Sequence, residues 1–161
     1  MNCESSKQDL RAPDGVKVLS LFDGMACGML ALIESGIKVC RYIAYEIDKY
    51  AIKTSTHNFP FIEHKGNVFE ADYSNVGNID ILLGGSPCQK WSCCQKKDRE
   101  VEASGVGWEL FSQYVRALHE VKPKYFIYEN NKSMSKQIKR SITDAFIFEG
   151  LNREDWEIIE E

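Results

Sequence analysis

The sequence predicts an α/β protein with a mostly parallel sheet, because short apolar runs rich in β-branched residues alternate with stretches of helical periodicity. Connections of this length form right-handed crossovers, which leave neighbouring strands parallel and both faces of the sheet covered. The 161 residues, of which 43% are hydrophobic, suffice for one domain with its own core. The expected sheet has five strands.

The first half of the chain is expected to hold three strands and two helices. The apolar run from Val16 to Phe22 ends at the turn residues Asp23 and Gly24, and apolar residues at helical spacing follow it. In chain order, the elements are a strand over 16–22, a helix over 29–36, a strand over 39–47, a helix over 50–57 and a weaker strand over 61–68.

The second half repeats the alternation with stronger signals. Residues 79–83 form an apolar run that leads into two glycines. Over 108–121, apolar residues recur at spacings of three and four, which predicts an amphipathic helix that ends before Pro123. A buried strand over 125–128 follows, and a helix from Ser133 to about Ala145 completes the pattern.

The charge is unevenly distributed along the chain. The net charge is −4, but an acidic tail at 146–161 alone carries −5, so the other residues carry about +1. A body with that charge can approach DNA without strong repulsion. Residues 1–15 form a polar leader without the apolar run of a signal peptide, and nothing in the chain resembles a membrane span. We expect a flexible leader and a cytoplasmic protein.

The six cysteines do not suggest a disulfide framework. Cys88, Cys93 and Cys94 cluster without a CxxC pair, and a reducing compartment would keep them as thiols. Cys27 and Cys40 lie in apolar segments and are expected to be small buried hydrophobes. A zinc site built from the three clustered thiols and one of the three histidines is a weak alternative, because structural zinc sites usually carry paired ligands. No metal ion is expected.

Polar residues and glycines gather where the predicted strands end. In an open parallel sheet, ligands bind beyond the carboxyl ends of the strands, near the point where the strand order reverses. Four strand ends carry such residues, namely Phe22-Asp23-Gly24, Glu46, Gly84 to Cys88, and Glu129-Asn130. We therefore expect them to meet at one edge of the sheet.

The glycine turn DGMACG would let the backbone approach a ligand. Glu46 lies 22 residues beyond Gly24, at the end of the next strand, which matches the spacing used to bind ribose hydroxyls. A tight strand-to-helix turn without a ligand explains the pattern equally well. The chain has no GxxxxGK[ST] motif, so hydrolysis of nucleoside triphosphates has no support, and the absence of GxGxxG disfavours a dinucleotide dehydrogenase.

The segment GGSPCQKWS is more specific. Two glycines relieve the backbone, Pro87 restricts it, and Cys88 is left projecting from a loop. A thiolate there is a competent nucleophile if positive charge stabilises it, and the nearby cations are Lys90, Lys96, Lys97 and Arg99. Glu129 follows a buried strand, where partial desolvation would let it hold a proton and donate a hydrogen bond, although most single glutamates are exposed loop acids.

Taken in order, the segments SLFDGMACG, YEID, GGSPCQ and ELFSQYVRALHEVKPKYFIYEN resemble the first half of C5-cytosine DNA methyltransferases. The likeness runs from about Val16 to Ala145 and is to bacterial or bacteriophage enzymes, such as those of restriction-modification systems. It implies a Rossmann-like methyltransferase fold that uses S-adenosylmethionine, with residues 16–145 as the catalytic domain. The implied substrate is a cytosine flipped out of DNA and methylated at C5.

The resemblance also implies roles for single residues. Cys88 would add to C6 of the cytosine as the nucleophile, and Glu129 would hold the base at N3 and N4. Glu46 would take the ribose hydroxyls of the cofactor, and Ile47 would pack on its adenine. All positions implied to contact the cofactor are Phe22, Asp23, Gly24, Gly28, Glu46, Ile47, Asn67, Val68, Pro87 and Leu110. The candidate DNA contacts are Gln89, Lys90, Ser92, Lys96 and Lys97. Basic clusters at 90–99 and 132–140 suit phosphate contacts, although a solvated face explains each cluster equally well.

The chain departs from the family's pattern in three respects. Asn67 stands where an acidic residue is usual, and Asn131 follows Glu-Asn where valine is usual. Family members also continue through a further catalytic strand, a domain that reads DNA sequence and a C-terminal helix that completes the cofactor pocket. We therefore expect a sheet that is incomplete at its C-terminal side, with an apolar edge that favours a dimer or a second polypeptide supplying target recognition.

Three hypotheses follow from this pattern. The chain is half of a split methyltransferase, or a catalytically inactive homologue that binds DNA or a full-length enzyme, or a phage protein that binds and inhibits a host factor. Retention of Cys88 and Glu129 favours the first, and the regions that are missing favour the other two.

Overall fold

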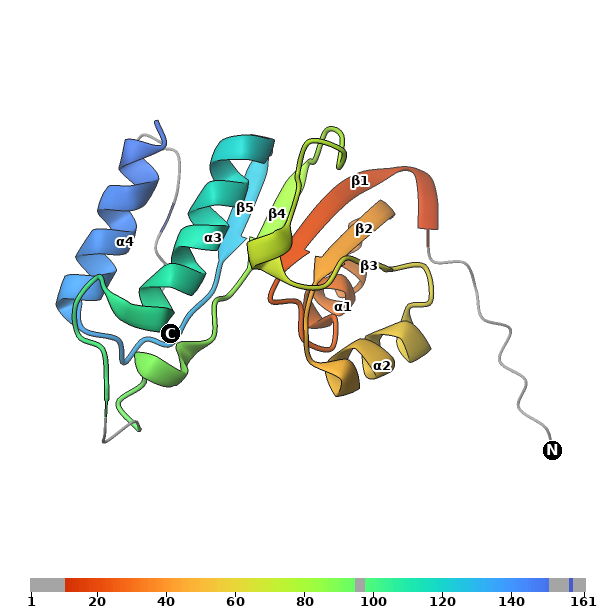
Figure 1. The fold of residues 1–161 in the computed structure, drawn as a ribbon. Helices are drawn as coiled ribbons and strands as arrows, with labels where there is room; N and C mark the ends of the chain where they lie inside the picture. The colour runs from red at the N-terminus through yellow and green to blue at the C-terminus, as the bar shows by residue number, and fades with distance from the viewer. Residues whose placement is uncertain (1–10, 95–97, 151–156, 158–161) are drawn as a thin grey trace.

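The computed structural model describes residues 11–94, 98–150 and 157. Within them, five strands form one all-parallel sheet in the order β3-β2-β1-β4-β5 (Figure 1). The strands are β1 (Arg11–Leu21), β2 (Val39–Tyr45), β3 (Glu63–His64), β4 (Ile81–Gly84) and β5 (Tyr125–Tyr128). The α/β class and the parallel sheet predicted from the sequence are confirmed.

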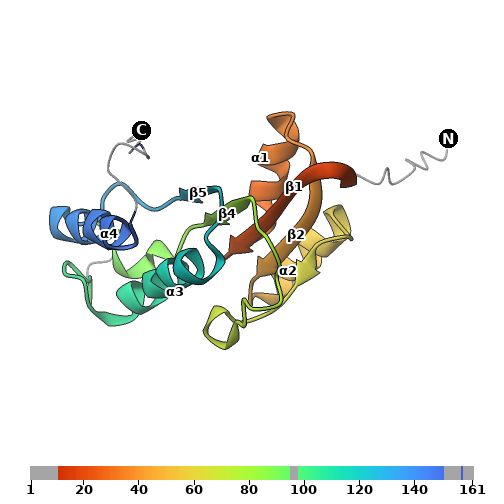
Figure 2. The same cartoon turned by 90° about the horizontal axis from the view of Figure 1, so that it is seen from above.

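Four α-helices connect or follow these strands in the described residues, and they lie on both faces of the sheet. They are α1 (Cys27–Glu34), α2 (Lys49–Asn58), α3 (Gly105–Val121) and α4 (Lys136–Phe148). Figure 2 shows α1 on one face and α3 on the opposite face. Asp48 caps α2 by accepting from the main-chain N–H groups of Tyr50 and Ala51. In the described ranges, no helix has the length and apolar character needed to cross a membrane.

Some element boundaries differ from the prediction. β1 begins at Arg11 rather than at residue 16, because an irregular register lets the preceding residues pair with β2 at Val39. The strand expected over 61–68 is reduced to the two residues of β3. Ser135, rather than Ser133, caps α4 by accepting from the N–H of Ile138.

The boundary placed at residue 146 lies inside a helix. α4 continues to Phe148, and the Phe146 side chain is buried in the core. Most of the acidic tail, and residues 1–10 of the leader, lie outside the described residues.

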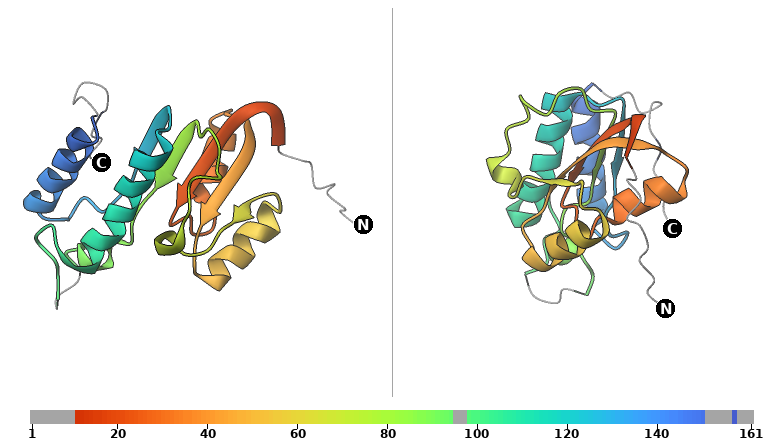
Figure 3. Two further views of the ribbon diagram at one scale, coloured as in Figure 1. Left: turned by 45° about the horizontal axis from the view of Figure 1, so that its top comes forward. Right: turned by 90° about the vertical axis from the view of Figure 1, so that its right-hand side faces the viewer.

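Two apolar clusters cover the two faces of the sheet. Leu82 belongs to the cluster beneath α3 and α4, where Phe111, Tyr114 and Phe146 pack against one another. Figures 1 and 3 show these two helices side by side near β4 and β5. The other cluster packs α1 against β1, β2 and β4 and includes Met29. Strand alternation therefore sends successive side chains of each central strand into different clusters.

The strand over 125–128 was expected to be buried, and this is wrong for one face, because β5 is an edge strand of the described sheet. Tyr125 and Ile127 are 69% and 58% exposed, although they pair in register with the buried residues Ile81 and Leu83 of β4. Helix α1 packs on the central strands β1, β2 and β4, but its cluster does not include residues of β5. This matches the expected uncovered face, for the part of the chain that the structure describes.

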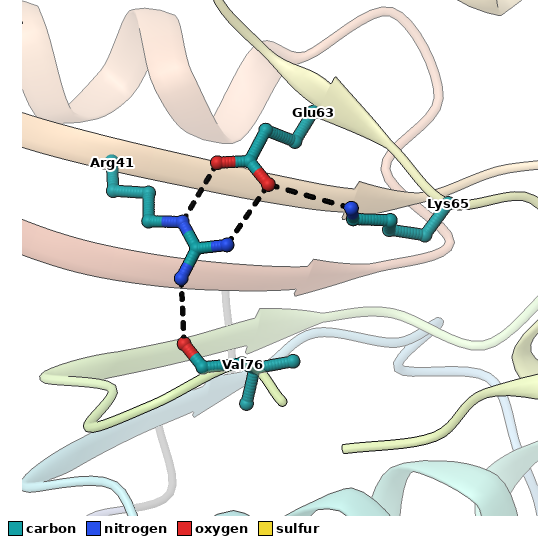
Figure 4. A network of polar contacts seen from close by, with 4 residues as sticks. All are labelled: Arg41, Glu63, Lys65 and Val76. Atoms are coloured by element: carbon teal, nitrogen blue, oxygen red, sulfur yellow. Dashed lines mark hydrogen bonds and ion pairs between the residues drawn. The ribbon is translucent and has the colours of Figure 1, made fainter. Parts of the chain in front are cut away.

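The opposite edge is held by a charged network. Arg41 of β2 forms a two-bond ion pair with Glu63 of β3, at 2.7 and 2.9 Å, and also donates to the carbonyl of Val76 at 2.7 Å (Figure 4). Lys65 approaches the same carboxylate at 3.5 Å. Since β3 has only two residues, this network supplies much of what fixes it to β2 and to the loop that carries Val76.

Candidate active site

The strand ends meet as the sequence predicts. β1 and β4 are neighbours, with β2 and β3 on one side and β5 on the other, so the strand order reverses between β1 and β4. The carboxyl ends of parallel strands share one edge, and a switch point of this kind is where open sheets bind ligands. The turn after β1 and Glu46 lie on one side of that point, and the Cys88 loop and Glu129 on the other.

The turn after β1 has an unusual backbone. Phe22, Gly24 and Ala26 have φ values of 57°, 58° and 67°, in the left-handed region that favours glycine. A Cβ on Gly24 would meet no atom within 4 Å, so its conformation, rather than crowding, requires glycine. Strained non-glycine residues of this kind often mark ligand sites.

Glu46 is fixed beside this turn. Its Oε2 accepts from the N–H of Gly24 at 2.8 Å, and its Oε1 accepts from Ile47 at 2.7 Å and Asp48 at 2.8 Å. A carboxylate has about four acceptor positions, so these bonds leave one position on Oε2. A ligand hydroxyl can bind there without displacing any of the three. The adjacent Ile47 side chain is 73% exposed and presents an apolar surface next to the carboxylate.

Asp23 is a buried carboxylate with an unused acceptor. It is 9% exposed, and its Oδ1 accepts from the Tyr42 hydroxyl at 2.7 Å. Its Oδ2 is buried and has no hydrogen-bond partner among the described residues. Burial is the largest cause that raises the pKa of Asp23 above its usual value. Hydrogen bonds from the side chains of Ser20 and Tyr42 oppose this rise in the pKa.

Asn67 and Val68 lie at the start of the short 3-10 helix η1 (Val68–Glu70). The Asn67 side chain accepts from the N–H of Phe69 at 3.1 Å and caps this turn. Val68 is buried in the core, so its main chain, and not its side chain, is the part that a ligand can reach. Its carbonyl accepts from Arg116 of α3 at 2.9 Å.

The two glycines after β4 allow close packing. A Cβ on Gly84 would lie 2.8 Å from the Tyr114 ring. At Gly85 it would lie 2.9 Å from the Glu129 carbonyl oxygen and 3.0 Å from the Glu129 Oε2. The carboxyl group of Glu129 therefore rests against the backbone that leads into Cys88. Any side chain at residue 85 would push Glu129 away.

Cys88 opens a second 3-10 helix, η2 (Cys88–Lys90), with Pro87 directly before it. The Cys88 carbonyl accepts from the N–H groups of Trp91 at 3.0 Å and Ser92 at 2.9 Å. Trp91 is fully buried and anchors the loop in the core below α3. Cys88 itself is half-buried, as a thiol in a ligand site can be.

The loops after β4 and β5 are bonded to each other. The N–H of Cys93 donates to the Ser133 Oγ at 3.0 Å, and Arg99 donates to the Ser133 carbonyl at 2.5 Å. Asn131 donates to the Ser92 Oγ at 3.4 Å, while its own Oδ1 accepts from the Ser133 N–H at 2.8 Å. The unusual asparagine at 131 thus has a local polar role. The predicted proximity of the Cys88 loop and the Glu129 loop agrees with this geometry.

Several side chains differ from expectation. Cys27 was expected to be buried, and this is wrong, because it opens α1 on the solvent side while Met29 faces the sheet. Cys40 is half-buried. Glu129 is exposed rather than partly desolvated. Among the thiols, a hydrogen bond to Ser133 is the main cause that lowers the pKa of Cys93 below its usual value.

The residues expected to contact DNA fall into three groups. Gln89 is exposed and Lys90 is half-buried, both on η2. Ser92 uses its hydroxyl oxygen within the loop, where it accepts from the Cys94 N–H at 3.2 Å. Lys96 and Lys97 lie outside the described residues.

The remaining predicted cofactor positions border the same region. Gly28 packs closely, since a Cβ there would lie 3.0 Å from Leu83 and 3.1 Å from the Tyr42 hydroxyl. Pro87 is exposed, and Leu110 is half-buried on α3. No group of three or more His, Cys, Asp or Glu side chains in the described ranges is placed to hold a metal ion.

Sequence reasoning missed a set of polar groups behind the thiol loop. Ser86, Tyr128 and Asn130 are mutually hydrogen-bonded, and they join the ends of β4 and β5. Their positions directly flank Pro87 and Glu129 in the sequence, which was the available signal.

The structure is thus a parallel α/β sheet with Glu46 beside a glycine turn on one side of the switch point and the Cys88 loop on the other, the arrangement in which α/β proteins bind ligands. The profile of the C-5 cytosine-specific DNA methylase family matches residues 16–158. The chain belongs to this family.

Individual relatives agree with this assignment. The orphan methyltransferase M.SPRI of Bacillus phage SPR is 36% identical over 121 residues, which cover 74% of this chain and 27% of the relative. The type II methyltransferase M1.ScrFI of Lactococcus lactis subsp. cremoris is 34% identical over 142 residues, covering 88% of this chain and 35% of the relative. The matched region thus spans about a quarter to a third of each of these relatives.

Proposed function

We propose that this chain carries the cofactor and nucleophile sites of a DNA (cytosine-5)-methyltransferase, which moves a methyl group from S-adenosylmethionine to C5 of a flipped cytosine. The observation that carries the proposal is the approach of Glu129 to the backbone of Gly85, three residues before Cys88. It brings an acid and a thiol loop together at the same edge of the sheet as Glu46.

The residues of the cofactor half suit S-adenosylmethionine. Glu46 keeps one acceptor position for a ribose hydroxyl, and Asp23 is a further proposed contact in the turn beside it. Ile47 would cover the adenine, with Asn67 and Val68 at its edge. The other proposed contacts are Phe22, Gly24, Gly28, Pro87 and Leu110. When bound, this cofactor would supply an electrophilic methyl group.

Cys88 and Glu129 would act on the cytosine. The Cys88 thiolate would form a bond to C6, and the electron pair of the C5–C6 double bond would make C5 nucleophilic toward the methyl group. Glu129 would hold N3 and N4 and supply a proton where negative charge develops. The electron pair of the broken methyl–sulfur bond would leave with S-adenosylhomocysteine. Loss of the C5 proton to solvent, return of the ring proton to Glu129 and release of the Cys88 thiolate would then restore the aromatic ring. Glu129 is exposed in the free protein, so the bound base itself would cover it.

DNA is the proposed substrate, with Gln89, Lys90, Ser92, Lys96 and Lys97 as contacts from the thiol loop. We also propose that selection of the target sequence involves a second polypeptide or a second copy of the chain. The exposed side chains of Tyr125 and Ile127 on the edge strand support such a contact. Action on DNA is consistent with the expected cytoplasmic location, which stays a prediction.

The test is transfer of a radiolabelled methyl group to mixed-sequence DNA, with nucleoside analysis to identify 5-methylcytosine. We expect Cys88→Ser to abolish transfer and Glu129→Gln to reduce it by about a hundredfold or more. Cys93→Ser is the matched control, because it changes a thiol in the same loop and keeps the N–H that bonds Ser133. Transfer that survives Cys88→Ser, or is absent from the wild type with DNA and cofactor, would count against the proposal.

A further inference from the structure

Resting on the proposed function, we propose that Tyr128 is a positioning residue. Its hydroxyl, together with Ser86 and Asn130, holds the Cys88 loop in register with Glu129. We call these three residues the hydroxyl–amide clamp. The clamp acts on the nucleophile and the acid through the backbone, because Ser86 lies two residues before Cys88, and Tyr128 and Asn130 flank Glu129.

The clamp is a compact set of hydrogen bonds between two loops. The Ser86 Oγ and the Tyr128 hydroxyl lie 2.7 Å apart. The Asn130 Nδ2 donates to the Ser86 carbonyl at 2.9 Å, to the Tyr128 hydroxyl at 3.0 Å and to the Ser86 Oγ at 3.3 Å. Ser86 is only 3% exposed, so water has little access to compete for these bonds.

Packing alone does not account for the hydroxyl. The Tyr128 ring lies among aromatic neighbours, with centroid distances of 5.2 Å to Phe111, 4.9 Å to Tyr114 and 6.0 Å to Phe146. A phenylalanine ring would fill the same space with the same neighbours. Burial raises the pKa of the Tyr128 hydroxyl to about 12, so it stays neutral and able to donate near pH 7.

The position of the clamp explains what it controls. Ser86 lies two residues before Cys88, and Pro87 between them has a restricted φ, so an anchored Ser86 limits where Cys88 can go. On the other strand, Tyr128 and Asn130 are the two neighbours of Glu129. The clamp therefore ties Tyr128 and Asn130, which flank the acid, to Ser86, which lies two residues before the nucleophile.

The other links between these segments lie on either side of the clamp. The N–H of Glu129 donates to the Gly84 carbonyl at 3.0 Å, which continues the pairing of β4 and β5. The bonds of Ser133 join the loops beyond Cys88. Loss of the clamp would thus loosen the segment from Ser86 to Cys88 while the strands remain paired.

The test compares Tyr128→Phe with Tyr114→Phe. Both variants remove one buried hydroxyl from the same aromatic cluster, but Tyr114 donates to the main-chain carbonyls of Leu82 and Ile127 rather than to the thiol loop. The probe is the rate at which iodoacetamide alkylates Cys88. The rate is measured separately for each cysteine, by mass spectrometry of the peptides, because the exposed Cys93 and Cys94 also react. Thermal melting of both variants establishes that each is folded under the assay conditions.

We expect Tyr128→Phe to speed alkylation of Cys88 by about fivefold or more, because the bonds of its hydroxyl to Ser86 and Asn130 are both lost. Tyr114→Phe should change the rate by less than about twofold. In methyl transfer, Tyr128→Phe should lower kcat and leave the KM for S-adenosylmethionine unchanged. The clamp also predicts non-additivity, so Ser86→Ala combined with Tyr128→Phe should do no more than the stronger single change. Equal alkylation rates in the two tyrosine variants, or additive effects in the double variant, would overturn the proposal.

Thiol reactivity separates this proposal from the proposed function. If the wild type transfers no methyl group but the alkylation rates follow the expected pattern, the geometric role of the clamp stands and the methyltransferase proposal fails. If the wild type transfers methyl groups and Tyr128→Phe behaves as Tyr114→Phe in both assays, the positioning role fails and the proposed function stands.

Discussion

Glu46, a proposed cofactor contact, is held in place by main-chain hydrogen bonds in the free protein. Three main-chain N–H groups fix its carboxylate, so binding a hydroxyl would not require the side chain to lose further conformational freedom. One of the donors belongs to Gly24, in the turn after β1, and the other two follow Glu46 itself. The same side chain thus joins the ends of β1 and β2 and offers an acceptor to a ligand.

At this residue, the prediction is that Glu46→Gln lowers the affinity for S-adenosylmethionine by at least about tenfold. The amide nitrogen cannot accept from the main-chain donors, so the substitution removes bonds on one side of the carboxyl group. Isothermal titration calorimetry measures the effect. Glu34→Gln, at the exposed end of α1, is the control and should bind as the wild type does. Equal affinities of the Glu46 and Glu34 variants would contradict the assigned role.

The short edge strand β3 is held to its neighbour partly by side chains. Two residues of strand pairing provide little stability, and the ion pair of Arg41 with Glu63 adds charged hydrogen bonds across the same edge. The bond from Arg41 to the Val76 carbonyl extends the effect to the following loop. η1 and Val68 lie between β3 and this loop in the chain, so the network also helps to position the proposed adenine edge of the site.

This network predicts a pH-dependent stability. The hydrogen bonds from Arg41 are the main cause that lowers the pKa of Glu63 below its usual 4.5. A carboxyl group with a lowered pKa in the folded state stabilises the fold above its usual pKa, and that contribution is lost as the pH falls through the lowered value. Chemical unfolding should show Glu63→Gln less stable than the wild type at pH 7, by about 1 kcal/mol or less for a partly exposed pair. The difference should shrink below pH 4.5. A difference that stays constant with pH would contradict this origin.

For the whole molecule, the uncovered face of β5 is the feature with the clearest consequence. Tyr125 and Ile127 lie on an edge strand and form an exposed apolar surface. Apolar edges of this kind pair with other chains unless charge or a bulge prevents it.

We therefore predict that the purified chain self-associates through β5. Sedimentation velocity should show a dimer or larger species, and Ile127→Lys should shift the distribution toward monomer by placing a charge on the edge strand. Leu30→Lys, at an exposed apolar position of α1, should leave the distribution unchanged. A clean monomer of the wild type across the accessible concentration range would contradict the prediction.

The alternation of apolar and polar residues determined much of the fold. All five strands and all four helices expected from the sequence are found in the described residues. For β5 the apolar run predicted the strand but not its exposure, which depends on its place at the edge of the sheet. Boundaries were less predictable. The start of β1 depends on an irregular register with β2, and the extent of β3 depends on Arg41, neither of which leaves a local pattern.

The sequence by itself determined which strand ends are candidates for chemistry, since turn glycines, Cys88 and Glu129 follow apolar runs at recognisable spacing. Only the tertiary structure decided how those ends meet. The approach of Glu129 to Gly85, the bonds of Glu46 to Gly24 and the clamp at Tyr128 each join residues far apart in the chain. Such contacts arise from strand order and register, which place distant backbones side by side, and a local pattern of residue types does not encode them.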